Sequence, residues 1–197
     1  MKRISFKDSG GLNLTQAVLS GRKTMTRRAV IEQVERDAMV YAEGKSEFTR
    51  VKFEYILKHS PYKVGDVVAI QQAYRDALKK YQWEDEYFEE MYEKSAGWTN
   101  KMFVKAELMP HHIRITDVRV ERLRDILDED CLREGVLAEL DPLENGKPAY
   151  DYYFDGHGRC WYNTPREAFA ALIDKVSGRG TWNSNPLVWA YSFELVD

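Results

Sequence analysis

The last third of the chain carries the clearest hydrophobic pattern. Residues 164–167, Thr-Pro-Arg-Glu, form a capping box with proline at the first helical position, and apolar residues then recur at helical spacing as far as Val176. Gly178 marks the end of this predicted helix. Apolar and polar residues alternate over 187–196, which predicts a half-buried closing strand. We expect Trp189, within that strand, to lie in the core.

Shorter patterns predict the other elements. Alternating or β-branched residues predict strands at 3–6, 67–74, 102–108 and 112–123. The last of these has one residue out of step near Thr116 and Asp117, and a hairpin at Met109 and Pro110 would join it to its predecessor. Helical spacing predicts helices at 14–21, 31–41, 51–59 and 129–134.

Two segments read as insertions into a single domain that spans 1–197. Residues 76–100 alternate aromatic and acidic side chains, which favours an amphipathic helix on the body of the protein or a surface for a protein partner. Residues 140–163 are dense in tyrosine, glycine and aspartate, and we interpret them as a long surface loop or lid.

Charge is distributed unevenly along the chain. The formal net charge is -3, which argues against a protein that coats nucleic acid by bulk electrostatics. Residues 1–36 nevertheless hold eight lysines or arginines against three acids, whereas 84–93 hold six acids and no base. A basic surface beside an acidic one is compatible with binding a short oligonucleotide or one nucleoside. It is equally compatible with two ordinary solvent-exposed faces that bind nothing.

Several classes of protein are not indicated. The sequence has no apolar run long enough to cross a membrane and no signal segment after Met1, so we predict a cytoplasmic protein without a membrane partner. Cys131 and Cys160 form no closely spaced pair, and the four histidines show no ligand spacing. We therefore predict no metal, no cofactor and no disulfide.

Candidate chemistry gathers in residues 19–28, a basic stretch with one glycine. A lysine close to a threonine can orient the hydroxyl and accept its proton if the fold removes the lysine from water. The alternative is that Gly21 ends a short helix and the basic side chains extend into solvent. A phosphate-binding P-loop is excluded, because Arg22 separates Gly21 from Lys23.

The pattern Gly-Arg-Lys-Thr-x-Thr-Arg-Arg at 21–28 resembles the ASCH domain of the PUA-like superfamily. Landmarks at 65–68, 109–126 and 182–186 agree in order, and the resemblance is strongest to longer members from phages and prophages. It implies an α+β fold: a PUA-like small β-barrel with flanking helices and the two insertions. Many relatives carry Arg-Glu where this chain has Gln71 and Gln72, so two charges are missing there.

The resemblance also implies a site. Bacterial ASCH enzymes that deacetylate N4-acetylcytidine use a lysine, a threonine and a glutamate, which match Lys23, Thr26 and Glu134. Thr26 would attack the amide carbonyl, Lys23 would accept its proton and Glu134 would pass a proton to the leaving amine. Lysine titrates near 10.4, so this role needs a lowered pKa. Nearby cations, predicted to bind the base or a phosphate, are Arg22, Arg27 and Arg28.

Retention of the motif does not separate catalysis from recognition. The same groups can hydrogen-bond a nucleobase without reaction, Glu134 accepting from an exocyclic amine, or Glu134 can simply pair with an arginine. We favour a pocket that binds a nucleobase in RNA, DNA or a modified nucleoside, with RNA as the expected nucleic acid. The alternatives are an N4-acetylcytidine amidohydrolase and a phage protein-interaction module that uses 76–100.

Overall fold

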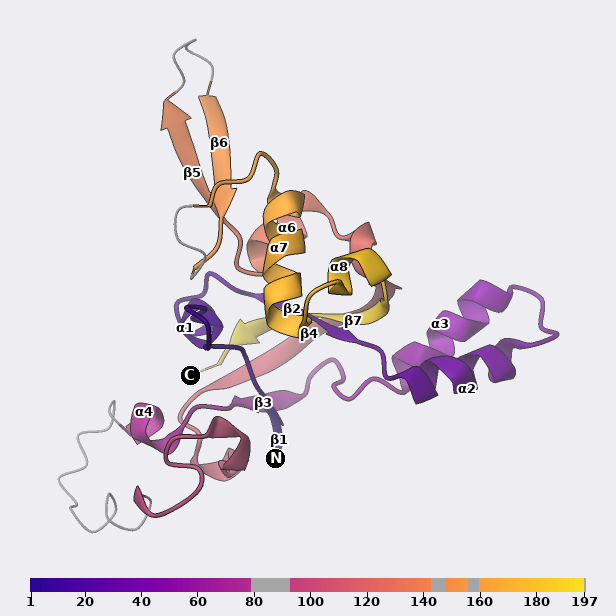
Figure 1. The fold of residues 1–197 in the computed structure, drawn as a ribbon. Helices are drawn as coiled ribbons and strands as arrows, with labels where there is room; N and C mark the ends of the chain where they lie inside the picture. The colour runs from indigo at the N-terminus through magenta and orange to yellow at the C-terminus, as the bar shows by residue number, and fades with distance from the viewer. Residues whose placement is uncertain (79–92, 143–147, 156–159, 197) are drawn as a thin grey trace.

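A computed structural model describes residues 1–78, 93–142, 148–155 and 160–196 (Figure 1). Its strands form a five-stranded sheet in the order β1-β3-β4-β7-β2 and a separate two-stranded hairpin, β5-β6. The strands are β1 (Lys2–Ile4), β2 (Met25–Ala29), β3 (Val67–Ile70), β4 (His112–Arg122), β5 (Leu137–Pro142), β6 (Pro148–Tyr153) and β7 (Leu187–Leu195). The α-helices are α1 (Leu14–Leu19), α2 (Glu32–Ala42), α3 (Phe48–Lys58), α4 (Tyr74–Leu78), α6 (Asp128–Arg133), α7 (Pro165–Ser177) and α8 (Thr181–Ser184).

Strand β7 is a deeply buried inner strand of the sheet. It pairs antiparallel with both β4 and β2, and its first seven residues are buried on both faces. The prediction of a half-buried strand is wrong here, because the alternate residues Val188 and Ala190 are as buried as the large apolar ones. Trp189 lies in the core as expected, and its indole nitrogen donates to the carbonyl of Ile56 at the inner side of α3.

Helix α7 confirms the prediction made from its capping box. The Thr164 hydroxyl accepts from the backbone N–H of Glu167 at 3.1 Å, and Pro165 occupies the first turn. The apolar stripe of the helix, which includes Phe169 and Leu172, is buried. Helix α7 packs against α6 and α8, and in Figure 1 the α2-α3 hairpin projects away from them.

The region before β4 departs from the prediction. Residues 102–108 do not form a strand but two 3₁₀ turns, Lys101–Phe103 and Ala106–Leu108, so Met109 and Pro110 are not a hairpin. The Asn100 side chain accepts from the Met102 N–H at 3.0 Å, and this cap favours the turn over an extended chain. Strand β3 takes the place beside β4, and β4 contains the expected irregularity, between Ile115 and Asp117.

The α+β class is confirmed, and among the described residues the sheet is open instead of closing into a barrel. Its edges are β1 and β2. Strand β1 is only three residues long and pairs with β3. It does not pair with β2, and such a pairing would be needed to close a barrel. A side chain joins the edges instead: the guanidinium of Arg28 on β2 donates to the carbonyl of Ser5, just after β1.

The two predicted insertions have different outcomes. The loop or lid predicted at 140–163 is wrong in part, because β5 and β6 form an antiparallel hairpin and Tyr152 makes a further β-bridge to Tyr162. The helix or partner surface predicted at 76–100 falls largely on 79–92, outside the described residues. In the described part of the chain, no helix is long and apolar enough to cross a membrane.

Candidate functional site

The basic stretch lies at the turn from α1 into β2. Helix α1 ends before Gly21, whose φ of 74° is left-handed, and the chain reverses there as the spacing predicted. The backbone N–H of Lys23 then donates to the Ala17 carbonyl at 2.9 Å, which fixes the lysine against the helix. Strand β2 was not predicted, because its sequence Met-Thr-Arg-Arg-Ala has almost no apolar alternation.

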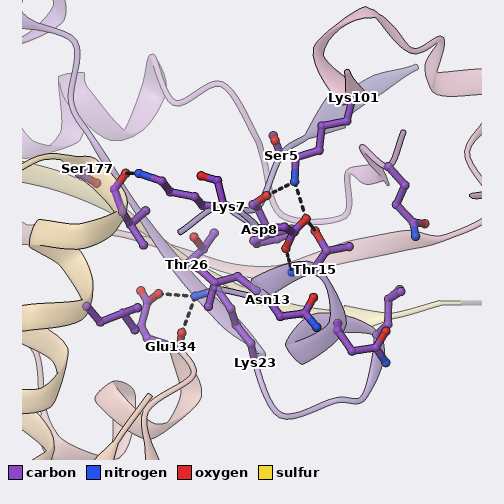
Figure 2. A pocket seen from close by; sticks show the side chains of 18 of the residues that line it. Ser5, Lys7, Asp8, Asn13, Thr15, Lys23, Thr26, Lys101, Glu134 and Ser177 are labelled. Atoms are coloured by element: carbon purple, nitrogen blue, oxygen red, sulfur yellow. Dashed lines mark hydrogen bonds and ion pairs between the residues drawn. The ribbon is translucent and has the colours of Figure 1, made fainter. Parts of the chain in front are cut away.

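Lys23 and Glu134 form a buried ion pair. Their side chains are 3% and 5% exposed, and the Lys23 Nζ lies 2.6 Å from the Glu134 Oε2. The same nitrogen donates to the Glu134 carbonyl oxygen at 2.7 Å, so both interactions fix the ammonium in place (Figure 2). Glu134 follows the last turn of α6 and precedes Gly135, whose φ is 109°. The structure thus joins two predicted site residues that are 111 positions apart.

Burial is the largest influence on the pKa of Lys23. Removal from water lowers the pKa of Lys23 below its ordinary value of 10.5, while the Glu134 carboxylate acts in the opposite direction. The neighbouring charges of Arg28 and Arg27 lower the pKa of Lys23 further. Burial and the neighbouring cations thus favour a neutral Lys23, whereas the carboxylate 2.6 Å away favours the charged form.

Thr26 lies on β2 and lines the same cavity as Lys23 and Glu134. Its backbone is paired with Tyr191 of β7, so its position is set by this buried inner strand. The residue is 5% exposed, and within the described ranges no group hydrogen-bonds to its hydroxyl. That hydroxyl is therefore available to a bound molecule.

The three predicted arginines have different environments. Arg27 is buried and bonded to three carboxylates: its guanidinium donates to Glu121 at 2.8 Å, to Asp130 at 3.0 Å and to Glu134 at 3.1 Å. Burial opposes its charge, but Glu134 and Glu121 outweigh this effect and raise the pKa of Arg27. Because these donors are occupied by protein carboxylates, Arg27 positions Glu134, and its predicted role as a ligand-binding cation stays a prediction.

Arg22 and Arg28 differ in whether their side chains line the cavity. Arg22 is exposed, pairs with Asp155 at 3.1 Å and is not among the residues that line the cavity, so its predicted binding role has no support from the geometry. Arg28 is half-buried and lines the cavity. Burial lowers the pKa of Arg28, with partial compensation from Tyr62 and Glu134.

The cavity itself has a volume of about 1040 Å³, at the top of the usual range of about 300–1,000 Å³ for ligand pockets. The segment after β1, helix α1, strand β2, helix α7 and residues around 72–76 and 99–101 form its wall. Gln72 is part of that wall, and its Oε1 is buried without a partner among the described residues.

A second polar cluster in the wall was missed by sequence reasoning. The Asp8 carboxylate accepts from the Thr15 N–H at 2.8 Å, from the Thr15 hydroxyl at 2.6 Å and from the Lys101 ammonium at 2.6 Å (Figure 2). Lys7, next to Asp8, also lines the cavity. No local signal in the sequence links Asp8 to Lys101, which lies 93 residues away.

Comparisons with known proteins add little to this geometry. No protein-family model and no curated protein matches the sequence. A crystal structure of protein EF3133 from Enterococcus faecalis V583, described by the family model DUF984, aligns with a TM-score of 0.45 at 14% sequence identity, covering 100% of this chain and 77% of that chain. The ASCH assignment has no support from these comparisons and stays a prediction from the motifs.

Proposed function

We propose that the cavity binds a nucleobase, in a nucleic acid or a modified nucleoside, through Lys23, Thr26 and Glu134. The observation that carries this proposal is the buried Lys23–Glu134 pair in the wall of an open cavity. A buried ion pair contributes little net stability, because desolvation offsets the attraction, so its place beside a cavity favours a functional role. The same proposal includes a PUA-like relationship. In it, the gap between the two edge strands, β1 and β2, would form the pocket.

The chemistry of the three groups suits a base edge. A lysine donates to carbonyl and ring-nitrogen acceptors, and a carboxylate accepts from an exocyclic amine such as that of cytosine. Glu134 already accepts from Lys23 and Arg27, yet a carboxylate has about four acceptor sites and can take one more donor. The hydroxyl of Thr26 can donate or accept.

A binding assay tests the proposal. Isothermal titration with cytidine, N4-acetylcytidine and the other common nucleosides is expected to show binding of a cytosine-type base, weakened about 10-fold or more, equivalent to about 1.4 kcal/mol, in Glu134→Gln. The amide keeps the shape of the carboxylate but loses its charge. Glu129→Gln, on the exposed face of the same helix, is the matched control. Equal affinity in Glu134→Gln and the wild type, or no binding of any nucleoside, would reject the proposal.

A second candidate function is hydrolysis of an N4-acyl group. It is favoured by the free Thr26 hydroxyl in the same wall as a lysine whose pKa is lowered by burial. The Thr26 oxygen would attack the acyl carbonyl as its proton passes to Lys23, and the C–N bond would break as the amine nitrogen takes up a proton. Water would then release the acyl group from Thr26 as a carboxylic acid.

Turnover of N4-acetylcytidine, followed by chromatography, separates hydrolysis from binding. Thr26→Val keeps the shape but removes the nucleophile, so the hydrolysis reading expects loss of cytidine formation, by at least about 100-fold, with binding retained. The exposed Thr116→Val is the control. The rate should rise with pH, because only the neutral amine of Lys23 accepts a proton and its pKa lies below 10.5. Unchanged turnover in Thr26→Val would exclude this mechanism.

A further inference from the structure

The lining of the cavity is more cationic than the protein as a whole. Its charged residues are Lys7, Lys23, Arg27, Arg28, Arg75, Lys101, Asp8, Asp76 and Glu134. Six cations therefore face three carboxylates, although the chain has a formal net charge of -3. A local excess of positive charge in a concave site attracts an anionic ligand more strongly than the same charges on a flat surface would.

Most of these cations already have an acidic partner. Lys23 pairs with Glu134, Lys101 with Asp8 and Arg75 with Asp76, while Arg27 is saturated by three carboxylates. That leaves Lys7 and Arg28. In the described part of the chain neither has a carboxylate within ion-pair distance. Both donate to backbone carbonyl oxygens, and Glu134 compensates the charge of Arg28 only in part and from a greater distance.

These contacts with neutral carbonyl oxygens position the two cations and occupy only some of their N–H donors. The Lys7 Nζ donates to the carbonyls of Lys175 and Val176, at 2.8 and 3.1 Å, in the last turn of α7 (Figure 2). Arg28 donates to the carbonyl of Ser5. An ammonium has three donors and a guanidinium five, so one donor of Lys7 and several of Arg28 are left for a ligand.

The two side chains also belong to one part of the cavity. Ser5, which accepts from Arg28, lies two residues before Lys7, in the segment that leaves the sheet after β1. Arg28 is in turn two residues after Thr26 on β2 and, because side chains alternate along a strand, lies on the same face as Thr26. The cations therefore border the region in which the base is proposed to bind.

We propose that Lys7 and Arg28 form a phosphate subsite, so that this cavity binds a nucleotide unit more tightly than the corresponding nucleoside. This inference rests on the proposed base-binding function and specifies its ligand. The cavity volume of about 1040 Å³ exceeds what a base alone needs and leaves room for sugar and phosphate. The phosphate belongs either to a free nucleotide or to a nucleic-acid strand, which share this chemistry.

The test compares a nucleoside with its phosphorylated forms. Affinities of cytidine, cytidine 5′-monophosphate, a cytidine-containing dinucleotide and inorganic phosphate are measured by isothermal titration at low and moderate salt. We expect a phosphorylated form to bind about 10-fold or more tightly than cytidine, with an advantage that falls as salt rises. In Lys7→Met that ratio should drop towards one, and Lys7→Arg should restore it. Lys58→Met, at an exposed position at the end of α3, is the matched control.

The outcomes separate this inference from the function on which it rests. Cytidine binding without any gain from phosphate would overturn the subsite and leave the base site intact. Phosphate binding that is sensitive to Lys7→Met, without cytidine binding, would keep the subsite and reject the base site. A tighter mononucleotide identifies a free nucleotide, and a tighter dinucleotide identifies a strand. If no compound binds, both proposals fail.

Discussion

Replacing Arg27 with methionine is expected to destabilise the protein by about 3–5 kcal/mol at neutral pH, the usual effect of removing one partner from a buried ion pair. The side chain is 1% exposed and is shared by Glu121, Asp130 and Glu134. Methionine fills much of the volume, but it leaves these carboxylates close together without their common cation. Their mutual repulsion, and not a cavity, is the cause of the expected loss.

The pH dependence of this loss tests its electrostatic origin. Burial opposes ionisation of Asp130, but hydrogen bonds from Arg27 and Arg119 prevail and hold its pKa below the ordinary value of 3.8. A carboxylate with a lowered folded-state pKa stabilises the fold above its unfolded pKa, and this contribution disappears as pH falls through the folded value. The difference between wild type and Arg27→Met should therefore be largest near pH 7 and shrink below about pH 4.

Urea denaturation at several pH values measures both quantities. Arg36→Met is the control, because Arg36 forms an exposed helical pair with Glu32 that should contribute no more than about 0.5 kcal/mol. A loss of stability in Arg27→Met that stays constant from pH 7 to pH 3 would point to packing instead of charge. A loss no greater than that of the control would show that the carboxylates tolerate each other without Arg27.

Local sequence signals were sufficient where a feature depends on neighbours in the chain. The α7 cap, the end of α1 at Gly21 and the irregularity in β4 each follow from a few adjacent residues, and each was predicted. Strand β2 was missed for the opposite reason. Its polar residues are strand-forming only because β7 supplies a partner and α6 supplies carboxylates for Arg27, and both elements are distant in sequence.

In the candidate site too, the local motif predicted some residues, whereas others depend on contacts distant in sequence. The family motif placed Lys23, Thr26 and Glu134 together, and the structure puts all three in one cavity wall. The motif could not rank the arginines, because the tertiary fold determines the partners of each. Arg27 donates to three buried carboxylates, whereas Arg28 donates to the backbone carbonyl of Ser5. Lys7 carried no signal at all, since its contacts are with the far end of α7.

Single and double variants of the Lys23–Glu134 pair should separate its effect on stability from its effect on ligand binding. Lys23→Met alone leaves Glu134 with only Arg27, and Glu134→Met alone leaves a buried ammonium with one carbonyl partner. Glu134→Met should lose about 3–5 kcal/mol of unfolding free energy, because an ammonium without a carboxylate stays buried. Lys23→Met should lose less, because Arg27 still pairs with Glu134. The double variant should recover most of this loss, since two apolar side chains can replace a buried ion pair at little net cost.

Ligand binding should follow a different pattern across the same three variants. If Lys23 and Glu134 contact the base, the double variant stays unable to bind cytidine although its stability has returned, because the donor and acceptor that read the base are both absent. Denaturation curves and titrations on the same preparations measure the two effects, with an interaction energy from the double-mutant cycle. Binding that recovers together with stability would mean that the pair only shapes the cavity, and recognition would then fall to Thr26 and Arg28.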